Sequence, residues 1–316
     1  MHEGKAKSSE LIIFEDGTLY HIDLKRADNI PPNIILVGSS ERVNLIAKQF
    51  DSVSFEHTNK SRPELHIITG TYKNTRVAAM SCGMGVGNME IVLTELHALF
   101  EFDHEKDSWS DKPARINIIR VGTSGASIKE VPLGALAISR YSIGLDNLGA
   151  FYPPKTEDKL AKTIEKRFLK TNLGKINPLS YAAAATEVVY KTLLRKAEEF
   201  GEKTPMIVSG ITTTSPGFFG PEGRSIGRIK SALTPEQFLN DIKNFEVDGL
   251  KIINHEMETS ILFRMANEIL EYNVGAICLV LDNIATNEII DGAKARERLE
   301  RGIKIALEAM VELAKK

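Results

Sequence analysis

The chain has 316 residues, of which 42% are hydrophobic and 26% are charged, and its formal net charge is −2. This composition can bury a large core, and the near-neutral charge argues against a nucleic-acid-binding protein, which normally carries a basic surface. No apolar run reaches the ~18–20 residues that cross a bilayer, and the polar first ten residues lack the apolar stretch of a secretory signal. We therefore expect a soluble, cytoplasmic protein with no nucleic-acid or membrane partner.

Short apolar runs alternate with amphipathic stretches along the chain. The runs at 34–37, 76–81, 116–121, 135–139, 206–210 and 274–281 are continuously apolar, which is typical of strands covered on both faces. Helical spacing is found at 41–49, 88–102, 157–169, 183–200, 235–245, 255–272 and 292–314. The alternation predicts an α/β fold with a mixed, largely parallel central sheet flanked by helices on both faces.

No linker or change of composition divides the chain, so we expect a single domain over residues 1–316 with an N-terminal extension at 1–19. The polar segment 101–115 contains Pro113 and is predicted to be a surface insertion between a helix and a strand. Residues 171–180 and 215–227 are predicted to be long loops, and such loops inside a compact domain are often functional.

The two cysteines, Cys82 and Cys278, lie far apart and each is inside an apolar run. This placement is typical of buried free thiols in a reducing compartment, with a disulfide between them as the alternative. The sequence has no clustered His and Cys pattern of the kind that binds zinc. We expect neither a metal nor an organic cofactor.

The first candidate site follows the predicted strand at 34–37, where Gly38 leads into a helix that carries Arg42. A glycine lets the backbone approach a ligand, and a helix N-terminus presents unpaired N–H groups to an anion. An ordinary capped turn, with Ser39 or Ser40 as N-cap and a solvated Arg42, is the alternative.

A second turn, at residues 82–88, also follows a strand and opens a helix. It resembles the dinucleotide-binding pattern G-x-G-x-x-G, but Asn88 stands at the third glycine. The acidic residue about twenty positions further on, Asp103, lies in a polar loop and not at a strand end. The turn therefore gives little support to a nicotinamide cofactor.

Two further clusters carry charged residues beside buried segments. Arg120 lies in an apolar strand, which requires an anionic partner, and Gly122 and Thr123 after it suit phosphate contacts; a structural salt bridge is the alternative. Residues 254–260 open a predicted helix with Glu256 and Glu258. Acidic residues there complement the helix dipole, although a carboxylate beside a pocket can also accept both hydroxyls of a ribose.

In this order and spacing, the clusters resemble the nucleoside phosphorylase superfamily, which includes uridine phosphorylases and hexameric purine nucleoside phosphorylases. The likeness runs from about Tyr20 to the C-terminus. The resemblance implies that phosphate is held by Gly38, Arg42, Arg120 and Thr123, and ribose by Met257 and Glu258, with Glu258 on the 2′- and 3′-hydroxyls. Arg42, Arg120 and Glu258 would be the catalytic residues.

The resemblance also implies sites shared between subunits. His21 matches a histidine that reaches into the neighbouring subunit's site toward the 5′-hydroxyl. A homodimer would be the minimal working unit, often built into a homohexamer. For the base, residues 218–224 resemble the uridine phosphorylase loop, in which Phe218 would stack on the ring, Glu222 would lie beside the base edge, and Arg224 would donate to an exocyclic oxygen.

The chain departs from the family pattern at three positions. Ser39 stands where the family usually has Asp, and Pro63 falls where many members carry an arginine, although Arg62 is adjacent. Glu222 replaces the expected Gln, which removes an amide donor and places a carboxylate against a carbonyl oxygen of uracil. Asp282 can be aligned with the acid that assists purine release in bacterial purine enzymes; a helix-cap role at the end of a strand is the alternative.

The resemblance is closest to uridine phosphorylases. It implies conversion of uridine and phosphate to uracil and ribose 1-phosphate through an oxocarbenium-like transition state, with phosphate as co-substrate. A purine nucleoside phosphorylase is the nearest alternative. A nucleosidase that uses water and an inactive nucleoside-binding or storage protein are the others.

Overall fold

The computed structural model describes residues 8–315. The first seven residues of the expected N-terminal extension lie outside this range. Residues 8–19 pack against the protein through Ile13 and Leu19, which are buried and form an antiparallel bridge with each other. No helix within 8–315 combines the length and the apolar character needed to cross a membrane.

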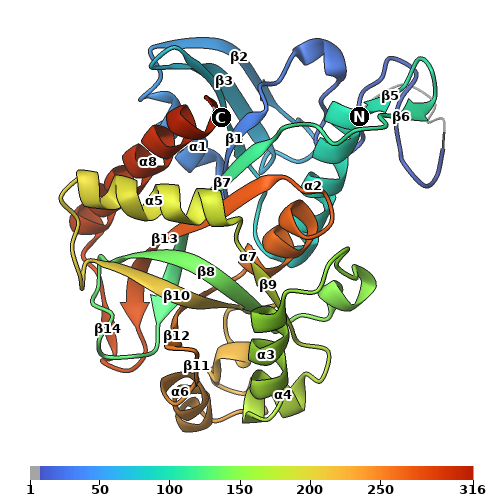
Figure 1. Cartoon of the computed structure of the whole chain (residues 1–316). Helices are drawn as coiled ribbons and strands as arrows, with labels where there is room; N and C mark the ends of the chain where they lie inside the picture. Colours follow the sequence, from blue (N-terminus) through green and yellow to red (C-terminus); the bar gives the residue numbers. More distant parts are fainter. Residues whose placement is uncertain (1–7, 316) are drawn as a thin grey trace.

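A large mixed sheet forms the centre of the molecule, as the sequence predicts (Figure 1). Its strands lie in the order β11-β12-β10-β8-β13-β7-β1-β4-β3-β2, with β9 beside β8 and β14 beside β13. The bounds are β1 Asn33–Val37, β2 Ser52–Thr58, β3 His66–Tyr72, β4 Thr75–Ser81, β7 Asn117–Ala126, β8 Leu136–Gly144, β9 Tyr181–Ala184, β10 Ile207–Thr214, β11 Glu246–Val247, β12 Leu250–Glu256, β13 Asn273–Asn283 and β14 Glu288–Ile289.

The strands that the sequence predicts form the parallel centre. Strand β1 runs parallel to β4 and β7, β7 parallel to β13, and β10 parallel to β8 and β12. The neighbours β13 and β8 are antiparallel, so two parallel groups meet there. Strands β2 and β3 were not predicted from the sequence. Strand β2 is antiparallel to β3 and forms an exposed edge of the sheet.

The helices cover both faces of the sheet. Their bounds are α1 Ser40–Ala47, α2 Val86–Glu101, α3 Lys159–Phe168, α4 Asn172–Ile176, α5 Glu187–Glu199, α6 Pro235–Lys243, α7 Thr259–Leu262 and α8 Gly292–Leu313. On β1, Ile34 and Leu36 pack in the same cluster as α2 and α7, while Ile35 and Val37 pack with α1, α5 and α8. This two-residue alternation between faces is the reason that a central strand is apolar throughout. Helices α3, α4 and α6 lie together at the end of the molecule opposite β2 and β3 (Figure 1).

Two predicted helices begin later than expected. Residues 255–256 end strand β12, and the helical segment starts at Thr259 and continues into a π-helical turn, Phe263–Asn267. The segment predicted as a helix from 183 contains the end of β9, and α5 begins after Thr186. In both cases a buried strand directly precedes a helix, so apolar periodicity does not mark the boundary.

The segment 101–115 forms a small hairpin of β5 (Phe102–Asp103) and β6 (Ser108–Trp109). The Trp109 ring stacks on His97 with centroids 4.7 Å apart, which fixes the hairpin on α2. Both cysteines are buried and free, and within residues 8–315 no group of three or more His, Cys, Asp or Glu side chains could hold a metal ion.

Candidate active site

The carboxyl ends of several strands open on one cavity of about 210 Å³. Its walls come from segments that are far apart in the sequence, which the parallel sheet brings to one edge. The lining residues are Gly38, Arg42, Met84, Arg120, Thr123, Ser124, Gly125, Phe218, Glu222, His255, Glu256, Met257, Glu258, Leu281 and Asp282. Nine of the eleven residues that the sequence assigned to phosphate, ribose, the base or its release are among them, and His21 and Arg224 are the two that do not line the cavity.

Arg42 lies on the first turn of α1, after the β1 turn that contains Gly38. It is half-buried and does not extend into solvent as the capped-turn alternative requires. Its Nε donates to Ser39 Oγ at 3.2 Å and its Nη1 donates to Val121 O at 3.3 Å. Burial and the neighbouring charge of Arg120 lower its pKa. Within the described chain Arg42 forms no ion pair, so its charge is available to an anion in the cavity.

Arg120 is buried at the cavity floor on β7. Its Nη2 lies 3.0 Å from Glu256 Oε2 and also forms an ion pair with Glu258. Although burial opposes the charge, the two carboxylates raise the pKa of Arg120 well above its ordinary value. A Cβ on Gly122 would lie 1.9 Å from Arg120 Nη1, so a residue with a side chain there would displace the guanidinium. The structural salt bridge that was the alternative for Arg120 is present, and its three residues line the cavity.

Glu256 and Glu258 have different environments. Glu256 accepts from Thr214 Oγ1 at 2.7 Å and from the backbone N–H groups of Glu258 and Thr259, so it anchors the start of α7. Glu258 accepts from the backbone N of Gly85 at 2.7 Å. The glycine turn at 82–88, which gave little support to a cofactor, therefore helps to position Glu258.

The loop at 215–227 forms the outer wall. Phe218 is 49% exposed, and the Arg224 guanidinium lies 4.2 Å from its ring centroid. Arg224 donates to Phe218 O, forms an ion pair with Glu222, and places Nη2 3.1 Å from Asp282 Oδ2. Asp282 lies within β13, where it pairs with Ile289 of β14, so it is not a helix cap.

The pKa values of both carboxyls beside Arg224 are raised. Burial raises the pKa of Glu222 to about 8; Arg224 opposes the shift, and the charges of Asp282 and Glu256 add to it. Burial also raises the pKa of Asp282, again against the effect of Arg224. One guanidinium is therefore not enough to keep two partly desolvated carboxyls fully ionised near neutral pH.

His255 is a cavity residue that the sequence analysis did not assign to the site. Its Nδ1 lies 3.2 Å from Ser127 Oγ, and its Nε2 lies 3.5 Å from Glu222 Oε2 without a hydrogen-bond partner. Burial and the charge of Arg224 lower its pKa to about 3, so the imidazole is neutral. A Cβ on Gly125 would lie 2.3 Å from Nε2, so the close approach of the strands needs this glycine.

His21 does not line the cavity of its own chain. Its Nδ1 lies 2.5 Å from Glu95 Oε1, and its carbonyl accepts from Asn59 Nδ2 at 2.7 Å. Arg62, the candidate substitute at the Pro63 departure, lies 4.7 Å over the ring of Tyr20. His21 also packs against Tyr20, so His21 and Arg62 belong to one surface region.

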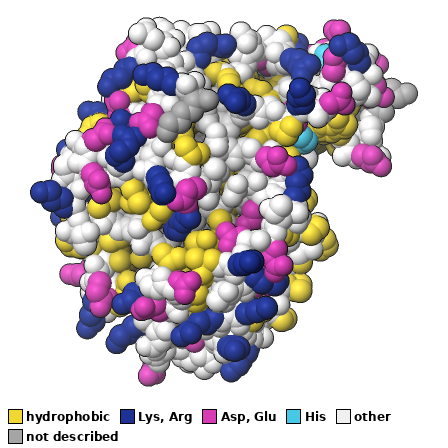
Figure 2. Space-filling view, in the orientation of Figure 1, with side chains coloured by type: hydrophobic (Ala, Val, Ile, Leu, Met, Phe, Trp, Pro, Cys, Tyr) yellow, Lys and Arg dark blue, Asp and Glu magenta, His cyan; other side chains and the backbone are white. Residues whose placement is uncertain are grey.

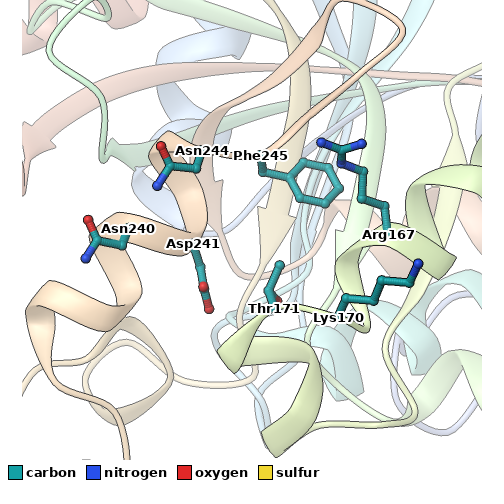
Figure 3. Close-up of a pocket in the computed structure, with 7 residues that line it drawn as sticks. All are labelled: Arg167, Lys170, Thr171, Asn240, Asp241, Asn244 and Phe245. Atoms are coloured by element: carbon teal, nitrogen blue, oxygen red, sulfur yellow. The ribbon is translucent and has the colours of Figure 1, made fainter.

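A second cavity, of about 380 Å³, lies between α3 and α6 (Figure 3). Its cations are Arg167 and Lys170, while Asp241 accepts from the backbone N of Leu173 and from Asn172 Nδ2 and so fixes the start of α4. It shares no lining residue with the strand-end cavity. On the face shown in Figure 2, basic and acidic side chains are interspersed over the surface.

The chain is similar in sequence and structure to known phosphorylases. Residues 32–315 match the family model of the phosphorylase superfamily. The chain is 25% identical to a uridine phosphorylase of Thermococcus kodakarensis over 313 residues, 98% of this chain and 92% of the relative. It is also 25% identical to a DeoD-type purine nucleoside phosphorylase of Buchnera aphidicola over 293 residues, 92% of this chain and 98% of the relative. A solved Trypanosoma brucei nucleoside phosphorylase, described as showing uridine phosphorylase activity, superposes with a TM-score of 0.85 at 31% identity, covering 96% of this chain and 99% of that one.

Proposed function

The chain belongs to the phosphorylase superfamily, in which it is a nucleoside phosphorylase, and we propose that it converts uridine and phosphate to uracil and ribose 1-phosphate. One observation carries the proposal. A single cavity brings together Arg42, which forms no ion pair within residues 8–315, the Arg120–Glu258 pair, and Phe218, whose ring packs against Arg224. These are the groups that phosphate, ribose and a pyrimidine require.

Arg42 and Arg120 are the proposed phosphate ligands, and Gly38 and Thr123 line the same cavity. Guanidinium groups bind phosphate oxygens with paired N–H donors, and such charge-assisted bonds are strong. The partly buried charge of Arg42 supports phosphate over water as the attacking group, since a nucleosidase has no need of a second cation there.

Cleavage of the N-glycosidic bond builds positive charge on the ribose and negative charge on the departing base. In the proposed mechanism Glu258, held by Gly85 and Arg120, accepts from the ribose hydroxyls and fixes the sugar above phosphate. Met257 packs on the sugar, Phe218 stacks on the base, and Arg224 stabilises the charge on a base oxygen.

The similarities to uridine phosphorylases and the Phe218–Arg224 contact support uridine. A 6-oxopurine is the second candidate, because the carboxyl of Asp282 lines the cavity with a raised pKa and could protonate a departing purine. The similarity to DeoD-type purine nucleoside phosphorylases also supports a purine substrate.

We expect uridine to be turned over faster than inosine when uridine, thymidine, inosine and adenosine are compared at fixed phosphate. Asp282→Asn distinguishes the two candidates. If Asp282 is the acid of a purine enzyme, this change lowers inosine turnover by ~10²-fold or more. Wild-type protein that cleaves inosine well and uridine barely would refute the choice of uridine and leave the family unchanged.

We also propose that the working unit is a homodimer or a hexamer built from dimers. The shared surface region of His21 and Arg62 supports this assembly, since each matches or adjoins a position that serves the neighbouring site in the family. Buried, free cysteines agree with a reducing, cytoplasmic location.

A further inference from the structure

The base end of the cavity holds more acidic groups than its cation can balance. Glu222 and Asp282 share Arg224. Glu256, the next carboxylate, pairs with Arg120 and anchors α7. The only other titratable group of the described chain in contact with Glu222 is His255, and its neutral imidazole adds no positive charge. With both shared carboxyls ionised, this group of residues would carry an unbalanced negative charge against the base.

We propose that Glu222 keeps its proton in the working enzyme and recognises the base as a neutral carboxylic acid, oriented by Arg224. The inference rests on the proposed nucleoside phosphorolysis but not on the choice between uridine and inosine. It assigns to Glu222 the role in base recognition that the amide of the family's Gln would otherwise have.

Burial decides which of the two carboxyls holds the proton. The side chain of Glu222 is 2% exposed, whereas that of Asp282 is 27% exposed and can keep part of its hydration. Desolvation disfavours the charged form of a carboxyl, so the more buried partner is the one protonated. The pKa of about 8 for Glu222 agrees with this assignment.

Arg224 decides which oxygen of Glu222 holds the proton. Its guanidinium donates to Oε2, so Oε2 is the acceptor oxygen, which leaves Oε1 to carry the proton and donate. His255 Nε2 lies 3.5 Å from Oε2 without a hydrogen bond to it, so the neutral imidazole packs beside the carboxyl and adds no charge.

A neutral carboxyl has one donor and one acceptor, as an amide does, whereas a carboxylate has acceptors only. The Oε1–H group can donate to a carbonyl oxygen of the base, and Oε2 can accept from the adjacent ring N–H. An ionised Glu222, in place of the family's Gln, would repel the base oxygen. A neutral Glu222 removes this repulsion. Uracil and 6-oxopurines both present this edge, so recognition should weaken when Glu222 ionises.

The test is the pH dependence of kcat/KM for whichever of uridine and inosine the wild type cleaves. The working form is present below the Glu222 pKa and is lost as the pH rises through it, so wild-type kcat/KM should fall ~10-fold between pH 7 and pH 9. Glu222→Gln should match the wild type within ~3-fold at pH 6.5, where the acid is neutral, and lose that decline. Because both proteins use the same nucleoside, ionisation of the base itself affects them equally.

Asp282→Asn is the matched control. It removes a negative neighbour, so the decline should persist and move to lower pH. A decline abolished by Asp282→Asn but kept by Glu222→Gln would overturn the assignment. So would a Glu222→Gln protein already ~10-fold faster than the wild type at pH 6.5, which would mean an ionised Glu222. Absence of turnover in both proteins at pH 6.5 would instead refute the proposed function.

Calorimetry of the wild type provides a test that needs no variant and no turnover. Uracil and hypoxanthine are titrated at pH 8.5 in two buffers of different ionisation enthalpy. Binding of either base should take up a fraction of a proton, because the neutral acid is the binding form. Binding without proton uptake would contradict the proposal.

Discussion

Glu258→Gln should lower kcat/KM for the nucleoside by ~10²-fold or more while the protein remains folded. Loss of a charge-assisted hydrogen bond costs about 1.5–3 kcal/mol, which is ~10–150-fold, and Glu258 is proposed to serve two ribose hydroxyls. Arg120 keeps Glu256 as a partner in the variant, so the buried cation is not left unpaired.

Glu256→Gln provides the contrast for this prediction. Glu256 accepts the N–H groups that begin α7, so its replacement should lower the melting temperature more than Glu258→Gln does. Both variants are compared with the wild type by initial rates at saturating phosphate and by thermal unfolding. A Glu258→Gln protein with wild-type kcat/KM would return Glu258 to a structural role as the partner of Arg120.

Arg42→Met should raise the KM for phosphate by ~10²-fold without lowering stability. The variant removes a partly buried charge that has no ion pair within the described chain, so folding loses only hydrogen bonds to Ser39 and Val121. Phosphate loses a guanidinium contact worth about 1.5–3 kcal/mol. The phosphate KM of Arg42→Lys should lie between those of the wild type and Arg42→Met. Lysine keeps the positive charge, but its ammonium cannot make the paired N–H contacts of a guanidinium.

Arg167→Met is the control for this prediction, because Arg167 is a cation of the cavity in Figure 3 and not of the strand-end cavity. Its phosphate KM should equal that of the wild type. If Arg167→Met weakened phosphate and Arg42→Met did not, the anion site would be between α3 and α6.

The central sheet follows from the sequence, because continuous apolar runs predict strands covered on both faces. The resemblance implied that Gly38, Arg120 and Thr123 share one phosphate site. The cavity contains all three. The resemblance placed Phe218, Glu222 and Met257, and the same cavity contains them.

Other features depend on long-range contacts that no local pattern encodes. The Gly85 N–H reaches Glu258 across 173 positions of the chain. Residues 254–256 are polar, and with the helix-like residues after them they suggested the start of a helix, yet they form the buried end of β12. His255 was consequently not placed beside Glu222. Its position depends on the pairing of β12 with β7 at Gly125.

The most direct test of phosphorolysis is to follow uridine cleavage with and without inorganic phosphate and to identify the sugar product by phosphorus and proton NMR. We predict that uracil and ribose 1-phosphate form in equal amounts when phosphate is present and that uridine remains intact when it is absent. Equal rates of uracil release under both conditions, with free ribose as the product, would contradict the proposed roles of Arg42 and Arg120 and identify a hydrolase.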